Sequence, residues 1–344
     1  MVAAAWGAAA VAGGALGNGT ANDRAAIQAC LDAAEAGQVV LEGGFDFAVG
    51  SPLFMRVGTT LMGWGATLRP TSGFSGGHLI GVDPNNHQSV WKVEGMTLRA
   101  RDSGGTVRAN NGVHVQRVDN ENRYHFEFLE FLDFPGAGIL LDNESWALSM
   151  EQIRCANCGI GIQMQQGGGP SSFGASTTQG WHNVSVIGCT VGVHLQDYVG
   201  FVFTNLYAED CDTAIRFGRN GEGGPVFRGG HVKNCDLWIG TDGSSTGHSR
   251  PSFMGFKFEG SATSGTLIRV PTHTYIGFYN CQFAPNGSPT VIDISSGGTA
   301  FFFEPDLDLR GVTTSCGNGS TIAMVLNGQF YRRTNNGSWS NNLW

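Results

Sequence analysis

The pattern of apolar and polar residues changes once along the chain, near residue 37. Before that point, apolar or small side chains recur at intervals of three and four: Ile27, Cys30, Leu31 and Ala34. This is the spacing of one face of an α-helix. Thr20 and Asp23 are candidate caps at its start, and Gly37 stands where a helix commonly ends. The pattern predicts one short helix.

After this helix the chain consists of short apolar runs. The segment 38–70, "QVVLEGGFDFAVGSPLFMRVGTTLMGWGATLRP", contains runs of four to six residues cut by Gly, Ser-Pro and Gly-Thr. Such runs are typical of strands separated by tight turns. We therefore expect strands, and no second long helix, after residue 37.

A repeat emerges from the spacing of these runs. A Val or Ile, in most cases followed two places later by another apolar residue, recurs at Val113, Ile139, Ile162, Val193, Ile215, Ile239, Ile268 and Ile292. Subtracting neighbours gives steps of 26, 23, 31, 22, 24, 29 and 24 residues. Units of this length indicate the coils of a solenoid.

Small residues form a second column that supports the same alignment. Four places before the repeated residue stand Cys158, Cys189, Cys211 and Cys235, and the same offset in other units gives Ala109, Pro135, Ser264 and Ser288. Compact residues at one register fit an inward corner where coils stack about 4.8 Å apart. We interpret these thiols, including the lone C-x-x-C of Cys155 and Cys158, as packing residues.

The predicted fold is all-β: a right-handed parallel β-helix, a solenoid formed by a single chain, with a short N-terminal capping helix. The units are too short for a helical crossover, so parallel pairing must come from winding strand over strand. We expect a leader and capping helix at 1–37, eight to ten coils at 38–300, and a C-terminal β segment at 301–344.

One register conflict is visible. By the coil offsets Glu130 falls in the column of Ile153, Val184 and Leu206, where a carboxylate would be costly to bury. We expect a bulge or a slipped coil near 127–133 rather than a buried charge.

Composition narrows the functions. The net charge of −8 and the pI near 5.5 argue against wholesale nucleic-acid binding. No apolar run approaches the roughly 18 residues of a membrane span, so we expect no membrane insertion. The spacing of the Cys residues matches no metal-binding motif, and we expect neither a metal site nor a cofactor.

Three stretches carry a resemblance to a known group. "NGTANDRAAIQACLDAA", "VVLEGGFDF" and "PLFMRVGTTLMGWGATLRP", which together span about Asn18 to Pro70, resemble the N-terminal signature of the pectate-lyase-like parallel β-helix superfamily, particularly bacteriophage tailspikes and polysaccharide depolymerases. The chain departs from that signature at Asn18 and at Asn22-Asp23-Arg24, within the cap.

The resemblance implies a function as well as a fold. It implies a phage tailspike-like protein that binds and depolymerises a bacterial surface or matrix polysaccharide, as a glycoside hydrolase or a polysaccharide lyase. It also implies a homotrimer, located outside the cell or on the virion as part of a phage tail. The alternative is a non-catalytic glycan-binding or structural tail protein. The short leader would leave room only for a minimal adaptor, or for a partner that attaches the protein.

Outward positions of successive coils become neighbours, which places candidate chemistry in rows. Carrying the coil steps backward gives three exposed columns: Arg154, Ser185, Tyr207 and His231; Ala156, Ile187, Glu209 and Lys233; and Glu151, His182, Thr204 and Arg228. We take Glu209, His231, Tyr207 and Arg228 as candidate catalytic residues. Glu151, Arg154, Trp181, His182 and Lys233 are candidate substrate-binding residues, with Trp181 and His182 as a sugar-stacking pair.

Two chemistries remain open for this set. Glycoside hydrolysis needs two suitably spaced carboxylates, whereas a lyase acting on a uronic acid needs a base and a cation near the developing charge. In either scheme Glu209 or His231 would move the proton and Arg228 would steady negative charge. The same residues could also be an ordinary solvated face.

Three further features stay open at this point. A second polar column, His114, Gln163, His194 and Arg216, followed by Gln116, Asp142, Gln165 and Gln196, could line a groove, although we favour a solvated or intersubunit face. Long connections at 165–180, 218–225 and 240–251 could wall a cleft. The segment 317–344 reads as a hairpin with two Asn-Gly turns, and its Phe330, Tyr331, Trp339 and Trp344 are expected to be exposed for packing on another surface.

Overall fold

The computed structural model describes residues 8–11, 13–34, 36–82, 91–116, 124–142, 148–165, 180–199, 202–222, 224–242, 250–260, 265–270, 274–294, 297–307 and 309–341. The chain divides into two compact units, Met1–Gly174 and Ala175–Trp344. Each unit is a stack of parallel β-coils, so the predicted all-β parallel β-helix is confirmed.

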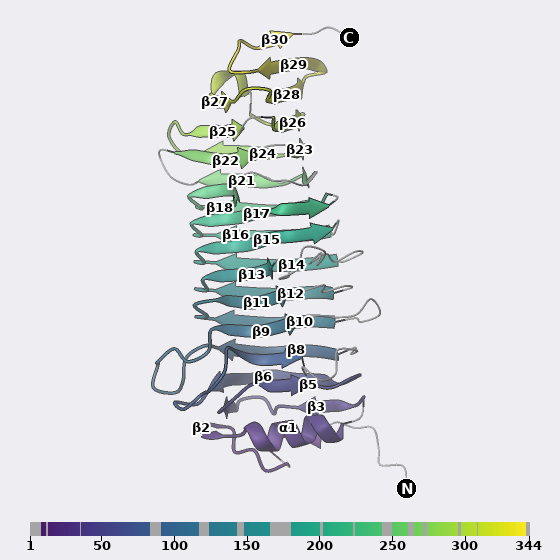
Figure 1. Ribbon diagram of the computed structural model, residues 1–344, viewed down its shortest axis with the longest axis vertical. Helices are drawn as coiled ribbons and strands as arrows, with labels where there is room; N and C mark the ends of the chain where they lie inside the picture. Colours follow the sequence, from purple (N-terminus) through teal and green to yellow (C-terminus); the bar gives the residue numbers. More distant parts are fainter. Residues whose placement is uncertain are drawn as a thin grey trace. The chain divides into compact units, whose positions relative to one another are not determined.

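The N-terminal unit begins with the predicted helix, α1 (Arg24–Ala33), which buries Ile27, Cys30 and Leu31. Figure 1 shows it at the N-terminal end of this unit, below β3. The prediction that the Asp23 side chain caps this helix is wrong. Asp23 is the residue before the helix, but its side chain makes no capping hydrogen bond. Its buried carboxylate instead accepts from the backbone N–H groups of Leu16, Gly17 and Ala48.

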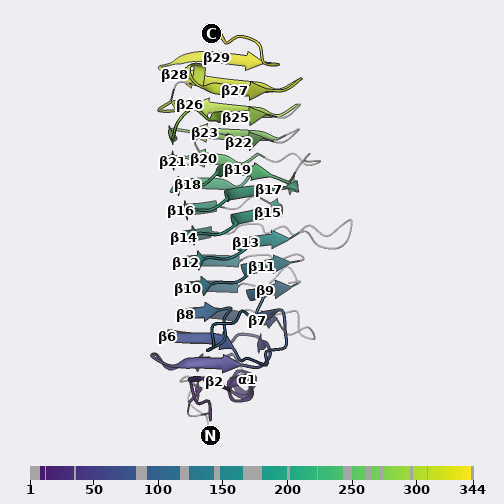
Figure 2. The ribbon, with the colours of Figure 1, turned by 90° about the vertical axis from the view of Figure 1, so that its left-hand side faces the viewer.

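Strands of the N-terminal unit form two parallel sheets. The first contains β1 (Ala8–Ala9), β2 (Asn18–Asn22), β3 (Gln38–Val40), β4 (Asp46–Val49), β6 (Thr60–Pro70), β8 (Trp91–Arg99), β10 (Tyr124–Leu132) and β12 (Leu148–Ala156). The second contains β5 (Leu53–Met55), β7 (His78–Val82), β9 (Asn111–Gln116), β11 (Ala137–Asp142) and β13 (Ile160–Gln165). Figure 2 shows the first sheet on one side of this unit, as β6, β8, β10 and β12, and the second sheet on the other, as β7, β9, β11 and β13.

The C-terminal unit repeats this plan. Its first sheet contains β14 (Gly180–Ile187), β16 (Val202–Glu209), β18 (Val226–Lys233), β20 (Ser252–Met254), β21 (Lys257–Gly260), β23 (Tyr275–Tyr279), β24 (Gln282–Pro285), β26 (Thr299–Phe303) and β28 (Thr321–Leu326). Its second sheet contains β15 (Val191–Val199), β17 (Thr213–Glu222), β19 (Leu237–Thr241), β22 (Thr266–Val270), β25 (Thr290–Ile294) and β27 (Thr313–Cys316).

The predicted repeat is the register of the second sheet. In the N-terminal unit Ile80, Val113, Ile139 and Ile162 lie opposite one another in successive strands. In the C-terminal unit the same holds for Val193, Ile215, Ile239, Ile268 and Ile292. All are fully buried, and burying each such side chain stabilises the fold by about 1.5–3 kcal/mol.

The core facing the first sheet of the C-terminal unit is a ladder of phenylalanines. Phe203, Phe227, Phe253, Phe278 and Phe302 stack with ring centroids 4.6–5.3 Å apart and interplanar angles of 8–14°. This separation is the strand spacing, so the rings stack because the coils do.

Each long strand of the first sheet bends once, at a residue in the left-handed conformation. These residues are Gly65, Gly95, Phe128 and Gln152 in the N-terminal unit, and Asn183, Asn205 and Gly229 in the C-terminal unit, with φ between 51° and 77°. The Asn205 side-chain amide donates to Asn183 Oδ1 across 3.2 Å. Gly and Asn tolerate this conformation best, which explains why they recur here.

Corner cysteines pack as predicted. Cys189, Cys211 and Cys235 are buried and each follows a left-handed residue. The Cys235 thiol donates to the carbonyls of Lys233 and Ala208 over 3.5 and 3.7 Å. Hydrogen bonding to the thiols of Cys189 and Cys235 raises the pKa of the Cys211 thiol, so Cys211 is a protonated packing residue.

The expected slip near Glu130 is present. Leu129, and not Glu130, lies opposite Ile153, while Glu130 lies opposite Arg154 and pairs with it at the surface. Phe128, in the left-handed conformation, is the bend that precedes this register.

The parallel coils continue past residue 300, through β27 and β28. The chain then turns at Asn327-Gly328, both with positive φ, into the antiparallel β29 (Gln329–Thr334) and β30 (Ser340–Asn341), so the hairpin is confirmed. A short 3-10 helix, η1 (Leu309–Gly311), precedes β27. The expected exposure of Tyr331 is wrong: it is 8% exposed and lies under the Arg310 guanidinium, 4.1 Å from the ring centroid. Phe330 and Trp339 are half-buried, and Trp344 lies outside the described residues.

Candidate functional site

Strands β16 and β18 place four of the predicted residues together in the C-terminal unit. Tyr207 lies opposite His231, and Glu209 lies opposite Lys233. Their side chains point outward because the alternating neighbours, Ala208 and Val232, are fully buried. All four outward residues are half-buried. The predicted columns are therefore confirmed at this point.

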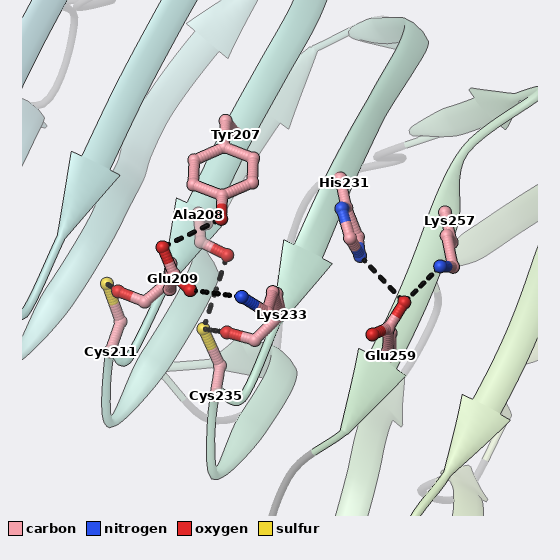
Figure 3. Close-up of polar contacts among 9 residues, drawn as sticks. All are labelled: Tyr207, Ala208, Glu209, Cys211, His231, Lys233, Cys235, Lys257 and Glu259. Carbon is pink, nitrogen blue, oxygen red and sulfur yellow. Dashed lines mark hydrogen bonds and ion pairs between the residues drawn. The ribbon is translucent and has the colours of Figure 1, made fainter.

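Glu209 is the centre of a hydrogen-bonded group (Figure 3). The Tyr207 hydroxyl donates to Glu209 Oε2 over 2.7 Å, and the Lys233 ammonium donates to Oε1 over 2.6 Å. The rings of Tyr207 and His231 meet edge to face, with centroids 5.8 Å apart. Phenol, carboxylate, ammonium and imidazole thus lie within two adjacent strands.

Two members of the group were not predicted. Lys257 and Glu259 stand on β21, opposite His231 and Lys233 respectively. Glu259 Oε2 lies 3.3 Å from His231 Nε2 and also pairs with the Lys257 ammonium, as Figure 3 shows. The signal was the alternation of "KFE" at 257–259, which matches "HVK" at 231–233. It was missed because register partners in adjacent strands are 26 residues apart in the first sheet here, from His231 to Lys257. In the second sheet they are 29 residues apart, from Ile239 to Ile268.

Hydrogen bonds, neighbouring charges and burial shift the pKa values of five of these side chains. Hydrogen bonds from Lys233 and Tyr207 lower the pKa of Glu209, and the bond from Lys257 lowers the pKa of Glu259. Burial and the hydrogen bond to Glu209 raise the pKa of Tyr207, and Glu209 raises the pKa of Lys233. Burial, followed by the Lys257 ammonium, lowers the pKa of His231. The six residues Tyr207, Glu209, His231, Lys233, Lys257 and Glu259 are called the acid–base cluster below. At pH 7 its two glutamates are therefore ionised, its phenol is protonated and its imidazole is neutral.

Arg228 and His182 are exposed but stand apart from this cluster. They share a column with Thr204 on the arm of the first sheet that precedes the bend. The left-handed Gly229 and Gly230 separate Arg228 from His231 within β18. Among the described residues, no hydrogen bond or ion pair joins Arg228 to the cluster.

Trp181 is not at the surface. It is fully buried and its indole packs against the Phe203 ring, with centroids 4.7 Å apart at 85°. Its predicted role in stacking on sugar is wrong, because alternation along β14 places Trp181 inward when His182 faces outward.

Glu151 and Arg154 belong to the N-terminal unit. The exposed Glu151 lies opposite Glu127, and Arg154 is paired with Glu130. Neither residue is therefore a member of the group around Glu209, which belongs to the C-terminal unit.

The second polar column forms a histidine–aspartate pair in each unit. In the C-terminal unit His194 Nε2 lies 2.6 Å from Asp242 Oδ2, and Arg216 is 3.9 Å from the same carboxylate. In the N-terminal unit His114 Nε2 lies 3.5 Å from Asp142, and its ring meets that of His78 with centroids 5.1 Å apart. Gln163 lies opposite Leu140, which is 8% exposed, and Gln165 opposite Asp142. The prediction that this column is a solvent-exposed face is wrong for His194, which is only 5% exposed.

The predicted walls of a cleft cannot be followed along their whole length. The predicted cleft walls include 166–179, 223 and 243–249, which lie outside the described residues. Within the described ranges no cluster of His, Cys, Asp and Glu has the arrangement of a metal site. The same ranges contain no helix with the length and hydropathy of a membrane span.

Comparison with known proteins establishes the fold. The tailspike gp42 of Acinetobacter phage vb_AbaP_AS12 is similar with a TM-score of 0.69 and 12% identity, over 95% of this chain and 64% of that one. The surface adhesin PfbA of Streptococcus pneumoniae is similar at 0.58 and 10%, over 98% and 99%. Tailspike protein 3 of bacteriophage CBA120 is similar at 0.57 and 10%, over 97% and 68%.

No family model and no curated protein matches the chain. This chain therefore has the parallel β-helix fold expected from the resemblance, and at such identities the likeness concerns the fold alone.

Proposed function

We propose that this protein binds and depolymerises an acidic bacterial polysaccharide, outside the cell or on a phage tail, and that it does so as a lyase. The observation that carries the proposal is the acid–base cluster of Tyr207, Glu209, His231, Lys233, Lys257 and Glu259 on three neighbouring strands. The fold shared with two tailspikes and an adhesin supports a role at a surface.

Hydrolysis is the less suitable chemistry for this cluster. A glycosidase needs one carboxylic acid that holds its proton at working pH, and such acids have raised pKa values. Both carboxylates here have lowered pKa values, because each accepts hydrogen bonds from a lysine.

β-Elimination suits the protonation states that these groups have at neutral pH. Neutral His231 would remove the proton from C5 of a uronate residue while Lys233 and Lys257 balance the charge that develops on its carboxylate. The C4–O bond would break as the C4–C5 double bond forms. Protonated Tyr207, which faces His231, would supply the proton that the leaving oxygen takes.

A second candidate is binding without turnover. It is favoured by one observation: Glu209 and Glu259 each already hold a lysine in an ion pair, so a bound acidic sugar must compete for those ammoniums. In this case the face would recognise a glycan or form part of a tail without cleaving anything.

The test is to incubate the protein with a panel of bacterial polysaccharides and oligouronates. A lyase generates reducing ends together with the ultraviolet absorbance of an unsaturated sugar. Reducing ends alone would contradict the elimination scheme, and binding without either signal would favour the second candidate. His231→Ala should abolish both signals, while Arg228→Ala, outside the cluster, should lower turnover only slightly.

Homotrimeric assembly is a separate part of the proposal. It is supported by the resemblance to tailspikes, and by the exposed or half-buried apolar residues of the C-terminal segment, Phe303, Phe330 and Trp339. Sedimentation at micromolar concentration should give a trimer, and a stable monomer would contradict it.

A further inference from the structure

Two aromatic side chains lie together at the surface of the N-terminal unit. Trp64 on β6 is 53% exposed and Phe128 on β10 is 38% exposed. Their ring centroids are 5.0 Å apart at an interplanar angle of 48°. A tryptophan this exposed loses the hydrophobic stabilisation that burial would give it.

Gly95 supports the Trp64 ring from below. It lies between the two aromatic residues on β8, with φ +76°, and a Cβ there would stand 2.7 Å from Trp64 Cδ2 and 2.9 Å from Cε2. The backbone of Gly95 therefore lies against the middle of one indole face. Because 53% of the residue is exposed, a large part of the indole stays open to solvent.

Phe128 holds an unfavourable backbone conformation. Its φ is 54°, whereas the same position of the neighbouring strands is Gly95 and Gln152, and in the C-terminal unit it is Asn or Gly. A bulky residue in this region is strained. Since Phe128 is exposed, core packing does not explain why an aromatic residue stands there.

Three glutamates form a row on neighbouring strands, and the middle one, Glu127, directly precedes Phe128 in the chain. Glu94, Glu127 and Glu151 lie opposite one another, each directly before the bend position. Lys92 is the nearby cation, and it lies 2.8 Å from Glu127 and also pairs with Glu94. Carboxylates accept hydrogen bonds from sugar hydroxyls, but three of them with one lysine repel a uronate.

We propose that Trp64 and Phe128 form a sugar-stacking platform that binds a neutral or amino hexose of a polysaccharide, with Glu127 and Glu151 accepting its hydroxyl or amide hydrogens. The proposal rests on the proposed function in taking the ligand to be a glycan. It adds a second binding site and a different sugar class from that expected at the acid–base cluster.

The test is binding to immobilised oligomers of glucose, N-acetylglucosamine, glucosamine and galacturonate, together with a broader glycan array. The parent protein should bind neutral or amino glycans in a Trp64-dependent manner. Trp64→Ala and Phe128→Ala should each weaken this binding by about tenfold, the effect of losing one good stacking contact. Tyr275→Ala, which removes an aromatic side chain that is 39% exposed in the C-terminal unit, is the matched control and should bind like the parent.

Phe128→Asn separates loss of binding from loss of folding. Asn tolerates the left-handed conformation, so this variant should melt at a higher temperature than the parent and yet bind as weakly as Phe128→Ala. Binding that is unchanged in all three platform variants would overturn the inference, as would the absence of any neutral or amino glycan ligand. A lower oligomeric state of Trp64→Ala would also overturn it, because the platform would then be a contact between copies.

The outcome for the platform is distinct from that for the proposed function. If polysaccharide cleavage is seen and the platform variants cleave and bind normally, only the platform fails. If Trp64-dependent binding is seen without cleavage of any polysaccharide, the platform stands and the lyase proposal fails.

Discussion

The Lys233 ammonium donates a hydrogen bond to Glu209 over 2.6 Å and joins two adjacent coils. Both groups are partly exposed, at 36% and 22% of their side chains. Such pairs contribute only about 0.2–1 kcal/mol to stability. The pair is therefore more informative about chemistry than about folding.

Glu209→Gln should lower the free energy of unfolding by less than about 1 kcal/mol. Under the elimination scheme Glu209 holds Lys233 and Tyr207 in place and does not itself remove the proton. Turnover should therefore fall by about tenfold or less, whereas His231→Ala should lose it entirely. Initial rates and urea denaturation check both parts, and a complete loss of turnover in Glu209→Gln would instead make Glu209 the base.

The pH dependence of turnover should identify His231 as the base. Burial and the Lys257 ammonium lower the pKa of His231, Glu259 opposes them in part, and the net pKa lies below 6.5. The rate should rise with pH as His231 loses its proton, with a midpoint below 6.5, and should fall again only when Tyr207 ionises above pH 10.

Two neighbouring substitutions should move that midpoint in opposite directions. Lys257→Met removes a cation and should shift the acid limb to higher pH. Glu259→Gln removes an anion and should shift it to lower pH. A midpoint that stays fixed in both pH–rate profiles would mean that another group titrates.

His78 should make the N-terminal unit sensitive to acid. Burial and the neighbouring His114 lower the pKa of His78 to about 4, from 6.5. The unfolded chain then binds more protons than the folded chain between these values, so stability is complete above pH 6.5 and is lost as pH falls toward 4. The full loss is about 3 kcal/mol. Chemical denaturation of His78→Gln across this range should show a flatter profile than the parent.

Substitution of Trp181 should cost far more stability than substitution of its neighbour His182. Trp181→Ala removes a fully buried ring that packs on Phe203 and should cost about 3–5 kcal/mol of stability. His182→Ala, one residue on, removes an exposed side chain and should change stability by about 0.5 kcal/mol or less. Denaturant midpoints measure both, and equal effects would contradict the inward placement of Trp181.

Sequence periodicity predicted the coils because inward positions must be apolar in every one of them. Val193, Ile215 and Ile239 could be aligned without any structure, and the outward partners Tyr207–His231 and Glu209–Lys233 followed from the same offsets. The prediction ended where the two sheets advance by different numbers of residues. Lys257 and Glu259 were missed for that reason, and Glu130 was one position out of register.

Other details depended on contacts that a spacing pattern does not contain. Asp23 had the sequence position of a cap, but its carboxylate is used by three backbone amides from 16–17 and 48. The platform of Trp64 and Phe128 was also not predicted, because the two residues are 64 positions apart in sequence and meet only through the bend at Gly95.

The bend at a left-handed residue makes each coil a complete module of chain. In the C-terminal unit Asn183, Asn205 and Gly229 mark the same point of three successive coils. Duplication of one such segment in the gene would supply its own bend, its own corner and its own inward ring, and would leave the modules on either side intact. The length of the outer face can therefore change by inheritance of whole modules, while the chemistry of each face varies residue by residue.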